Sequence, residues 1–105
     1  MGVKNKSKEA VIRSIAHSMQ VSLESYFLSF NAYPEDSQLK LSQLIEKFNS
    51  KGITMPTPKN PFTGSQYSQS DNSGQITYQW NTITRTYTLS GFGVNNSEEI
   101  VSVTN

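Results

Sequence analysis

The sequence predicts an α+β fold: a long N-terminal amphipathic helix packed on an antiparallel sheet of three to four strands, with a second short helix. Apolar residues recur at helical spacing over residues 8–33, and polar and apolar residues alternate over residues 75–105. A chain of 105 residues has the size of one domain, so residues 1–105 are expected to form a single unit.

The first helix is expected over residues 8–33, after a flexible segment at residues 1–7. No Gly or Pro interrupts this stretch. Pro34 lacks a backbone N–H and restricts Tyr33, so the helix should stop there. With about 100° of rotation per residue, eight side chains fall on one face and form a core stripe. These residues are Ile12, Ile15, Ala16, Met19, Leu23, Tyr26, Phe27 and Phe30.

A second, weaker seam lies on the opposite side of the same helix. Its members recur close to every 3.5 residues, as in helices that pack against other helices. They are Ala10, Ser14, His17, Val21 and Leu28. Two interpretations are open: an assembly face, or the scattered apolar residues found on most protein surfaces.

Residues 36–51 are expected to form the second helix, with Asp36 or Ser37 as its N-cap and Gly52 at its end. Its apolar residues, Leu41, Leu44, Ile45 and Phe48, follow helical spacing. Residues 52–74 are rich in Gly, Pro, Ser, Thr and Asn and predict a long loop. That loop is either anchored through Ile53, Met55, Phe62 and Tyr67 or partly disordered.

Residues 75–80, 84–89 and 99–104 are expected to be antiparallel strands. Ile76, Tyr78 and Trp80 share one face of the first strand, and Val101 and Val103 share one face of the last. Gly91-Phe92-Gly93 and Asn95-Asn96 predict the second turn of this sheet.

Composition excludes several classes of function. There is no cysteine, which rules out disulfides, thiolate metal sites and thiol catalysis. The net charge is +1 without long runs of one sign, which argues against a nucleic-acid footprint on the domain. No cofactor motif is present, because Gly91-Phe92-Gly93 lacks the third glycine of a dinucleotide-binding loop.

No catalytic constellation emerges. His17 is the single histidine, and it is interpreted as an exposed helical residue or, alternatively, as a catalytic or ligand group. Glu98 and Glu99 would point to opposite sides of a strand, and Glu35-Asp36 are expected to be helix-start charges. Asp71 is a weak calcium candidate, with Glu98 or Glu99 as additional ligands; an ordinary Asx turn is the alternative.

The order of several short motifs resembles the globular domain of type IV pilins and of type II secretion pseudopilins. They are LESYFLSFNAYP from Leu23 to Pro34, Asn60-Pro61-Phe62, and Tyr87-Thr88-Leu89-Ser90-Gly91-Phe92-Gly93 before a Val-rich strand. The resemblance covers the chain from about Lys8 onward.

The resemblance implies a non-enzymatic subunit that polymerises with copies of itself through its N-terminal helix. It also implies a hydrophobic segment upstream of this helix, which anchors the precursor in the inner membrane and later packs inside a filament at the cell surface. The implied partners are inner-membrane assembly machinery and minor pilins, and the 105-residue chain itself is expected to be soluble.

Two alternatives to a pilus subunit remain open. One is a pseudopilin of a secretion or DNA-uptake system. The other is a monomeric ligand- or carbohydrate-binding module, which would use the 52–74 loop and the sheet and would show an exposed aromatic cluster.

Overall fold

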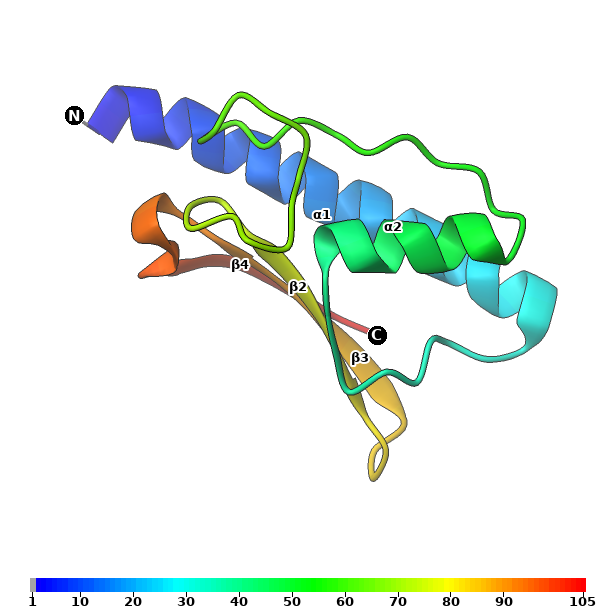
Figure 1. Cartoon of the computed structure of the whole chain (residues 1–105). Coiled ribbons are helices and arrows are strands. Elements are labelled where there is room, and N and C mark those ends of the chain that lie inside the picture. Colours follow the sequence, from blue (N-terminus) through cyan, green and yellow to red (C-terminus); the bar gives the residue numbers. More distant parts are fainter. Residues whose placement is uncertain (1) are drawn as a thin grey trace.

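The computed structural model describes residues 2–105 and confirms the α+β class (Figure 1). A four-stranded antiparallel sheet has the order β1-β2-β3-β4, and both helices lie over the same face of it. The elements are α1 (Gly2–Phe30), β1 (Gln38–Lys40), α2 (Leu41–Ser50), β2 (Ile76–Asn81), β3 (Thr86–Phe92), a 3-10 turn η1 (Val94–Asn96) and β4 (Glu99–Thr104).

Both ends of α1 differ from the prediction. The helix begins at Gly2, before the expected start at residue 8, and Met1 lies outside the described residues. The helix ends at Phe30, before the expected Tyr33. Asn31 adopts a left-handed φ of 54°, and its N–H donates to the Phe27 carbonyl at 2.7 Å. This is the usual left-handed C-terminal cap, and it stops the helix before Pro34 can.

The second helix is shorter than predicted because part of its sequence forms an unpredicted strand. Residues 38–40 pair with β2 as β1, and α2 begins only at Leu41. Asp36 and Ser37 therefore do not cap it. The Gln43 side chain accepts a bond from the Lys40 N–H at 2.8 Å instead. The end matches expectation, since Gly52 has a positive φ of 85° just after the last turn.

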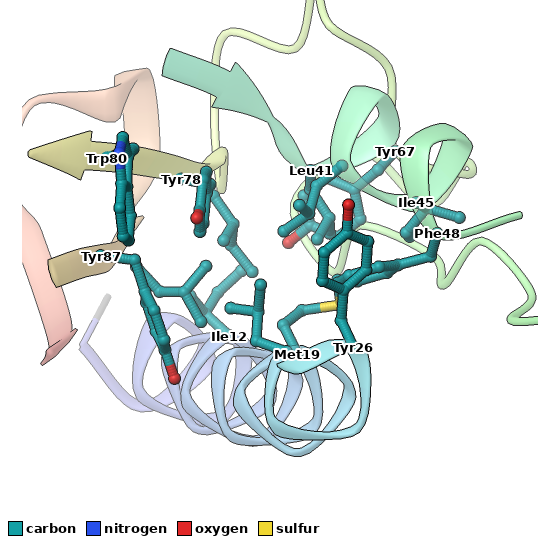
Figure 2. Packing of buried hydrophobic residues seen from close by; sticks show 14 residues of the cluster. Ile12, Met19, Tyr26, Leu41, Ile45, Phe48, Tyr67, Tyr78, Trp80 and Tyr87 are labelled. Carbon is teal, nitrogen blue, oxygen red and sulfur yellow. The ribbon is translucent and has the colours of Figure 1, made fainter. Parts of the chain in front are cut away.

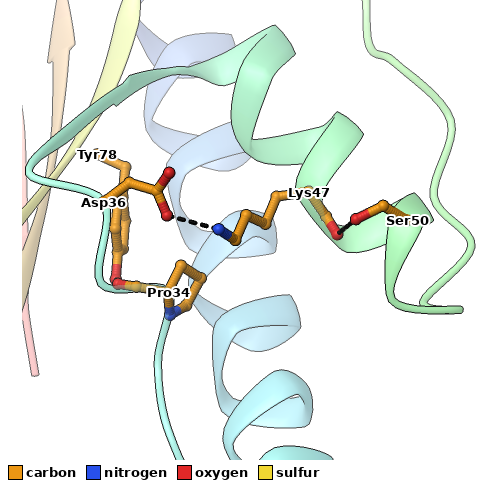
Figure 3. Close-up of polar contacts among 5 residues, drawn as sticks. All are labelled: Pro34, Asp36, Lys47, Ser50 and Tyr78. Carbon is orange, nitrogen blue, oxygen red and sulfur yellow. Dashed lines mark hydrogen bonds and ion pairs between the residues drawn. The ribbon is translucent and has the colours of Figure 1, made fainter.

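Two polar contacts hold the segment between the helices (Figure 3). The Tyr78 hydroxyl donates to the Pro34 carbonyl, and Asp36 pairs with Lys47 of α2 at 2.7 Å. Asp36 is thus an ion-pair partner rather than a helix-start charge. These contacts fold α2 back over the same face of the sheet as α1.

The core lies between the helices and the inner face of the sheet (Figure 2). Helix α1 contributes Ile12, Ala16, Met19, Leu23 and Tyr26, and α2 contributes Leu41, Leu44, Ile45 and Phe48. The sheet contributes Ile76, Tyr78, Trp80, Tyr87 and Leu89. Of the remaining predicted stripe, Ile15 and Phe27 are half-buried.

Phe30 is not a core residue, although its spacing predicts one. It is 43% exposed, packs beside Tyr26 with ring centroids 4.8 Å apart, and lies under the Lys51 ammonium. Phe30 is the last helical residue, and this end of α1 extends past the sheet (Figure 1). Helical periodicity gives the direction of a side chain but not whether anything covers it.

Gly91 lies inside β3 rather than in a turn. A Cβ atom there would come within 2.6 Å of both the Ile12 and Val101 side chains. The missing side chain therefore lets α1 approach the sheet closely. The turn itself is η1, where Asn95 and Asn96 both have positive φ angles.

The 52–74 loop contains no strand but is anchored. It runs back along the helices toward the N-terminal half of α1 (Figure 1), where the Lys8 ammonium lies 5.4 Å from the Phe62 ring centroid. Asn60 is fully buried, and its amide donates to the Asp71 carboxylate and the Ser73 carbonyl. Tyr67 is also buried and donates to the Gly74 carbonyl at 2.7 Å. Of the two interpretations of this loop, the structure supports the anchored one.

Gly91→Ala is expected to lower the free energy of unfolding by about 1–3 kcal/mol, because the added methyl group overpacks the contact between α1 and the sheet. Urea unfolding measures this change in the free energy of unfolding. Gly93→Ala is the matched control, since its Cβ would find no atom closer than 3.7 Å. Equal effects of the two substitutions would contradict the close packing at Gly91.

The buried tyrosines should make the fold sensitive to alkali. Burial raises the pKa of Tyr67, Tyr78 and Tyr87 above the ordinary value of about 10. Above that pH the unfolded chain releases phenolic protons that the folded chain retains, so stability falls as pH rises. Urea unfolding at about pH 8 and pH 11 should show this loss; unchanged stability would contradict the burial of these hydroxyls.

Candidate functional site

The candidate site is the outward face of α1, defined by Ala10, Ser14, His17, Val21 and Leu28. All five side chains are exposed. They lie opposite the buried stripe because the two sets differ by about half a turn of helical rotation. The structure therefore places the five predicted residues together on one surface.

Two of these residues are apolar and largely uncovered. Val21 is 68% exposed and Leu28 is 86% exposed. Two further apolar residues of α1 are 43% exposed: Val11, at the margin of the same face, and Phe30, in the core stripe. Single exposed apolar residues are ordinary on proteins, but the two most exposed ones of α1 share the outward face.

The outward face also lacks formal charge. From Ala10 to Phe30, α1 has two charged residues, Arg13 and Glu24. Helical rotation places both at one border of the outward face. The other exposed residues there are serines, Ser18, Ser25 and Ser29, which sequence reasoning missed. The signal that could have found them is the absence of charge, because a solvated helix usually alternates charged residues on its exposed side.

Hydrogen bonds at the border fix how α1 is rotated. The Glu24 carboxylate accepts bonds from the Tyr87 hydroxyl of β3 at 3.0 Å and from the Tyr33 hydroxyl at 3.0 and 3.1 Å. Desolvation, followed by the contact with Glu24, raises the pKa of Tyr33. Glu24 is therefore held toward the sheet, which leaves the face around Val21 and Leu28 directed outward.

The helix that carries this face runs the length of the molecule. A 29-residue helix is about 43 Å long, and the longest dimension of the domain is 44 Å. Neither α2 nor the 52–74 loop covers this side of α1, because all five of its side chains are exposed. The arrangement suits lateral packing against another helix rather than enclosure of a small molecule.

The candidate catalytic residues are not brought together. Within residues 6–105, the His17 ring has no hydrogen-bond partner, so no base and carboxylate pair forms around it. Glu35 lies 4.0 Å from Arg85, and Asp36 is occupied by Lys47. Glu98 and Glu99 are exposed at the start of β4.

Asp71 acts as a structural residue of the loop. Its carboxylate accepts bonds from the Asn60 amide at 3.0 Å and from the Ser68 N–H at 3.1 Å. The Asn96 side-chain amide donates to the backbone carbonyl of Asp71. This contact comes from Asn96 rather than from the expected Glu98 or Glu99. Over the described residues, no three His, Asp or Glu side chains gather as a metal site would require.

Comparison of the chain with protein-family models, with curated proteins and with solved structures yields no match. In the part of the chain that the structure describes, neither helix is long and apolar enough to cross a membrane.

Calcium should leave the thermal unfolding midpoint unchanged, because the Asp71 carboxylate is engaged in the loop and lacks companion carboxylates. Asp71→Asn, in contrast, should lower the free energy of unfolding by about 1–2 kcal/mol through weaker bonds to Asn60 and Ser68. Calorimetry with and without calcium tests both points. A calcium-dependent rise that Asp71→Asn removes would restore the metal interpretation.

Proposed function

We propose that this protein is a non-enzymatic structural subunit of a pilus or pilus-like filament and polymerises through α1. The observation that carries the proposal is the uncharged outward face of α1, with Val21 and Leu28 exposed directly opposite the buried stripe. The resemblance of the Leu23 to Pro34 segment to pilin helix ends supplies the class of assembly.

The physical argument rests on desolvation. Packing two helices together removes water from both faces, and that step is costly for unpaired charges. The face from Ala10 to Ser29 presents small, hydroxyl-bearing and aliphatic side chains, with His17 as its one titratable group. Helices can therefore approach closely there without burying a permanent charge.

In the proposed filament, a hydrophobic segment upstream of α1 would continue this helix and supply most of the buried contact. The outward face would then orient neighbouring subunits around that core. The sheet would remain on the outside, since it lies on the other side of α1 (Figure 1).

The arrangement of aromatic side chains argues against a monomeric module that would bind its ligand on an exposed aromatic cluster. Among residues 6–105, Phe30 is the one exposed aromatic residue, and it lies at the end of α1. Tyr26, Tyr67, Tyr78, Trp80 and Tyr87 are buried, and they hold the layers together.

Replacement of Val21 and Leu28 together by Glu is expected to abolish filament assembly, because each interface would then bury unpaired carboxylates. The substitutions should change the free energy of unfolding of the 105-residue chain by about 0.5 kcal/mol or less per site, since both side chains are exposed. Electron microscopy of cells that express the full-length gene measures assembly.

Ile83→Glu is the matched control for this test. Ile83 is 90% exposed and lies in the β2–β3 turn, away from α1. Filaments should form with this variant. Normal filaments from the Val21 and Leu28 double variant would refute assembly through the outward face.

A further inference from the structure

A surface pocket of about 420 Å³ lies at the β2–β3 hairpin end of the sheet. This volume falls within the usual range for small-molecule sites. The lining comes from the segment before β1, from the ends of β2 and β3, and from the turn between them. It consists of Ser37, Gln79, Trp80, Asn81, Thr82, Ile83, Thr86 and Thr88.

The pocket is built on paired strands. Gln79 is directly opposite Thr88, and Asn81 is opposite Thr86. The Trp80 N–H donates to the Ser37 carbonyl at 3.2 Å, which fixes the segment before β1 beside β2. The Asn81 side chain accepts bonds from the Ile83 and Thr84 N–H groups and so fixes the turn.

Three of the lining side chains face away from the core. Strand alternation puts Gln79, Thr86 and Thr88 on the outer face, because Tyr78, Trp80, Tyr87 and Leu89 point inward and are buried. Among residues 6–105, the Gln79 amide has no hydrogen-bond partner, so its donors and its acceptor are free for a ligand.

None of the lining residues carries a charge, and of the two charged residues next to them in sequence, Asp36 is ion-paired and Arg85 is exposed. Asp36, beside Ser37, pairs with Lys47 at 2.7 Å. Arg85, beside Thr86, lies 4.0 Å from Glu35. The pocket therefore offers hydroxyl and amide groups with an aliphatic wall at Ile83, which is 90% exposed.

We propose that this pocket binds a neutral saccharide. Hydroxyl and amide side chains can donate to and accept from sugar hydroxyls in turn, whereas an ionic ligand would find no countercharge in the lining. Ile83 presents an aliphatic surface to the C–H groups of a sugar ring. The site lies on the sheet face away from α1, so it is independent of filament assembly.

Trp80, the one tryptophan of the chain, lies in β2 between the lining residues Gln79 and Asn81, so its fluorescence can report binding there. The 105-residue protein is titrated with cellobiose and with N,N′-diacetylchitobiose, and with glucuronate as a charged probe. Tryptophan fluorescence and amide chemical shifts are recorded. At least one disaccharide should bind saturably, with a Kd on the order of 1 mM and shifts centred on residues 79–88.

Gln79→Ala and Thr88→Val should each weaken that binding by about five- to tenfold, since each removes a hydrogen-bonding group. Ser102→Ala, on the same outer face but outside the pocket, should leave affinity unchanged. Unchanged circular dichroism shows that each variant folds.

The proposal is overturned by any of three results: neither disaccharide gives a saturable signal, the shifts map away from residues 79–88, or the two pocket variants bind as well as the parent chain. Equal or tighter binding of glucuronate would overturn the preference for a neutral ligand.

Discussion

The close contact between α1 and β3 at Gly91 is the constraint on which the rest of the structure depends. Ile12 and Val101 occupy the space that any other residue at position 91 would need. At the other end of the contact, the Tyr87 hydroxyl of β3 bonds to Glu24 of α1. These two contacts fix both the distance of α1 from the sheet and its rotation about its own axis. The direction of its outward face therefore follows from the packing of its inner face.

Periodicity was sufficient to predict the helix layer and the sheet layer of this molecule, because the spacing of apolar residues indicates which face of a helix or strand is buried. It could not predict β1. Residues 38–40 resemble the start of a helix until the rest of the sheet is present, since the pairing partners of β1 lie in β2. The same limit applies to Gly91, whose role depends on Ile12 and Val101 from two other elements.

The candidate site was more predictable than its surroundings. Val21 and Leu28 were found from helical spacing alone, because a regular helix fixes the side on which each residue lies. Phe30 shows where that reasoning ends, since its direction is correct but no element covers it. The pocket was missed because its residues come from three separate segments, which only the hairpin register and the Ser37 contact bring together.

The molecule presents two different surfaces on opposite sides. The outward face of α1 is small and partly aliphatic, whereas the outer face of the sheet carries hydroxyl and amide groups. Assembly through α1 would leave the second surface open to the surroundings. One domain could thus polymerise through one layer and contact neutral ligands through the other.

Cysteine cross-linking tests the central claim most directly, because the chain has no cysteine of its own. Ser14→Cys and Leu28→Cys are introduced together into the full-length gene, and assembled material is oxidised and separated without reductant. A ladder of covalent multimers is expected from this pair, and none from a matched sheet-side pair, Ile83→Cys with Ser102→Cys, which also gives each subunit two thiols. Assembled material in which the α1 pair stays monomeric, or in which the sheet-side pair forms the ladder instead, would contradict assembly through the outward face of α1.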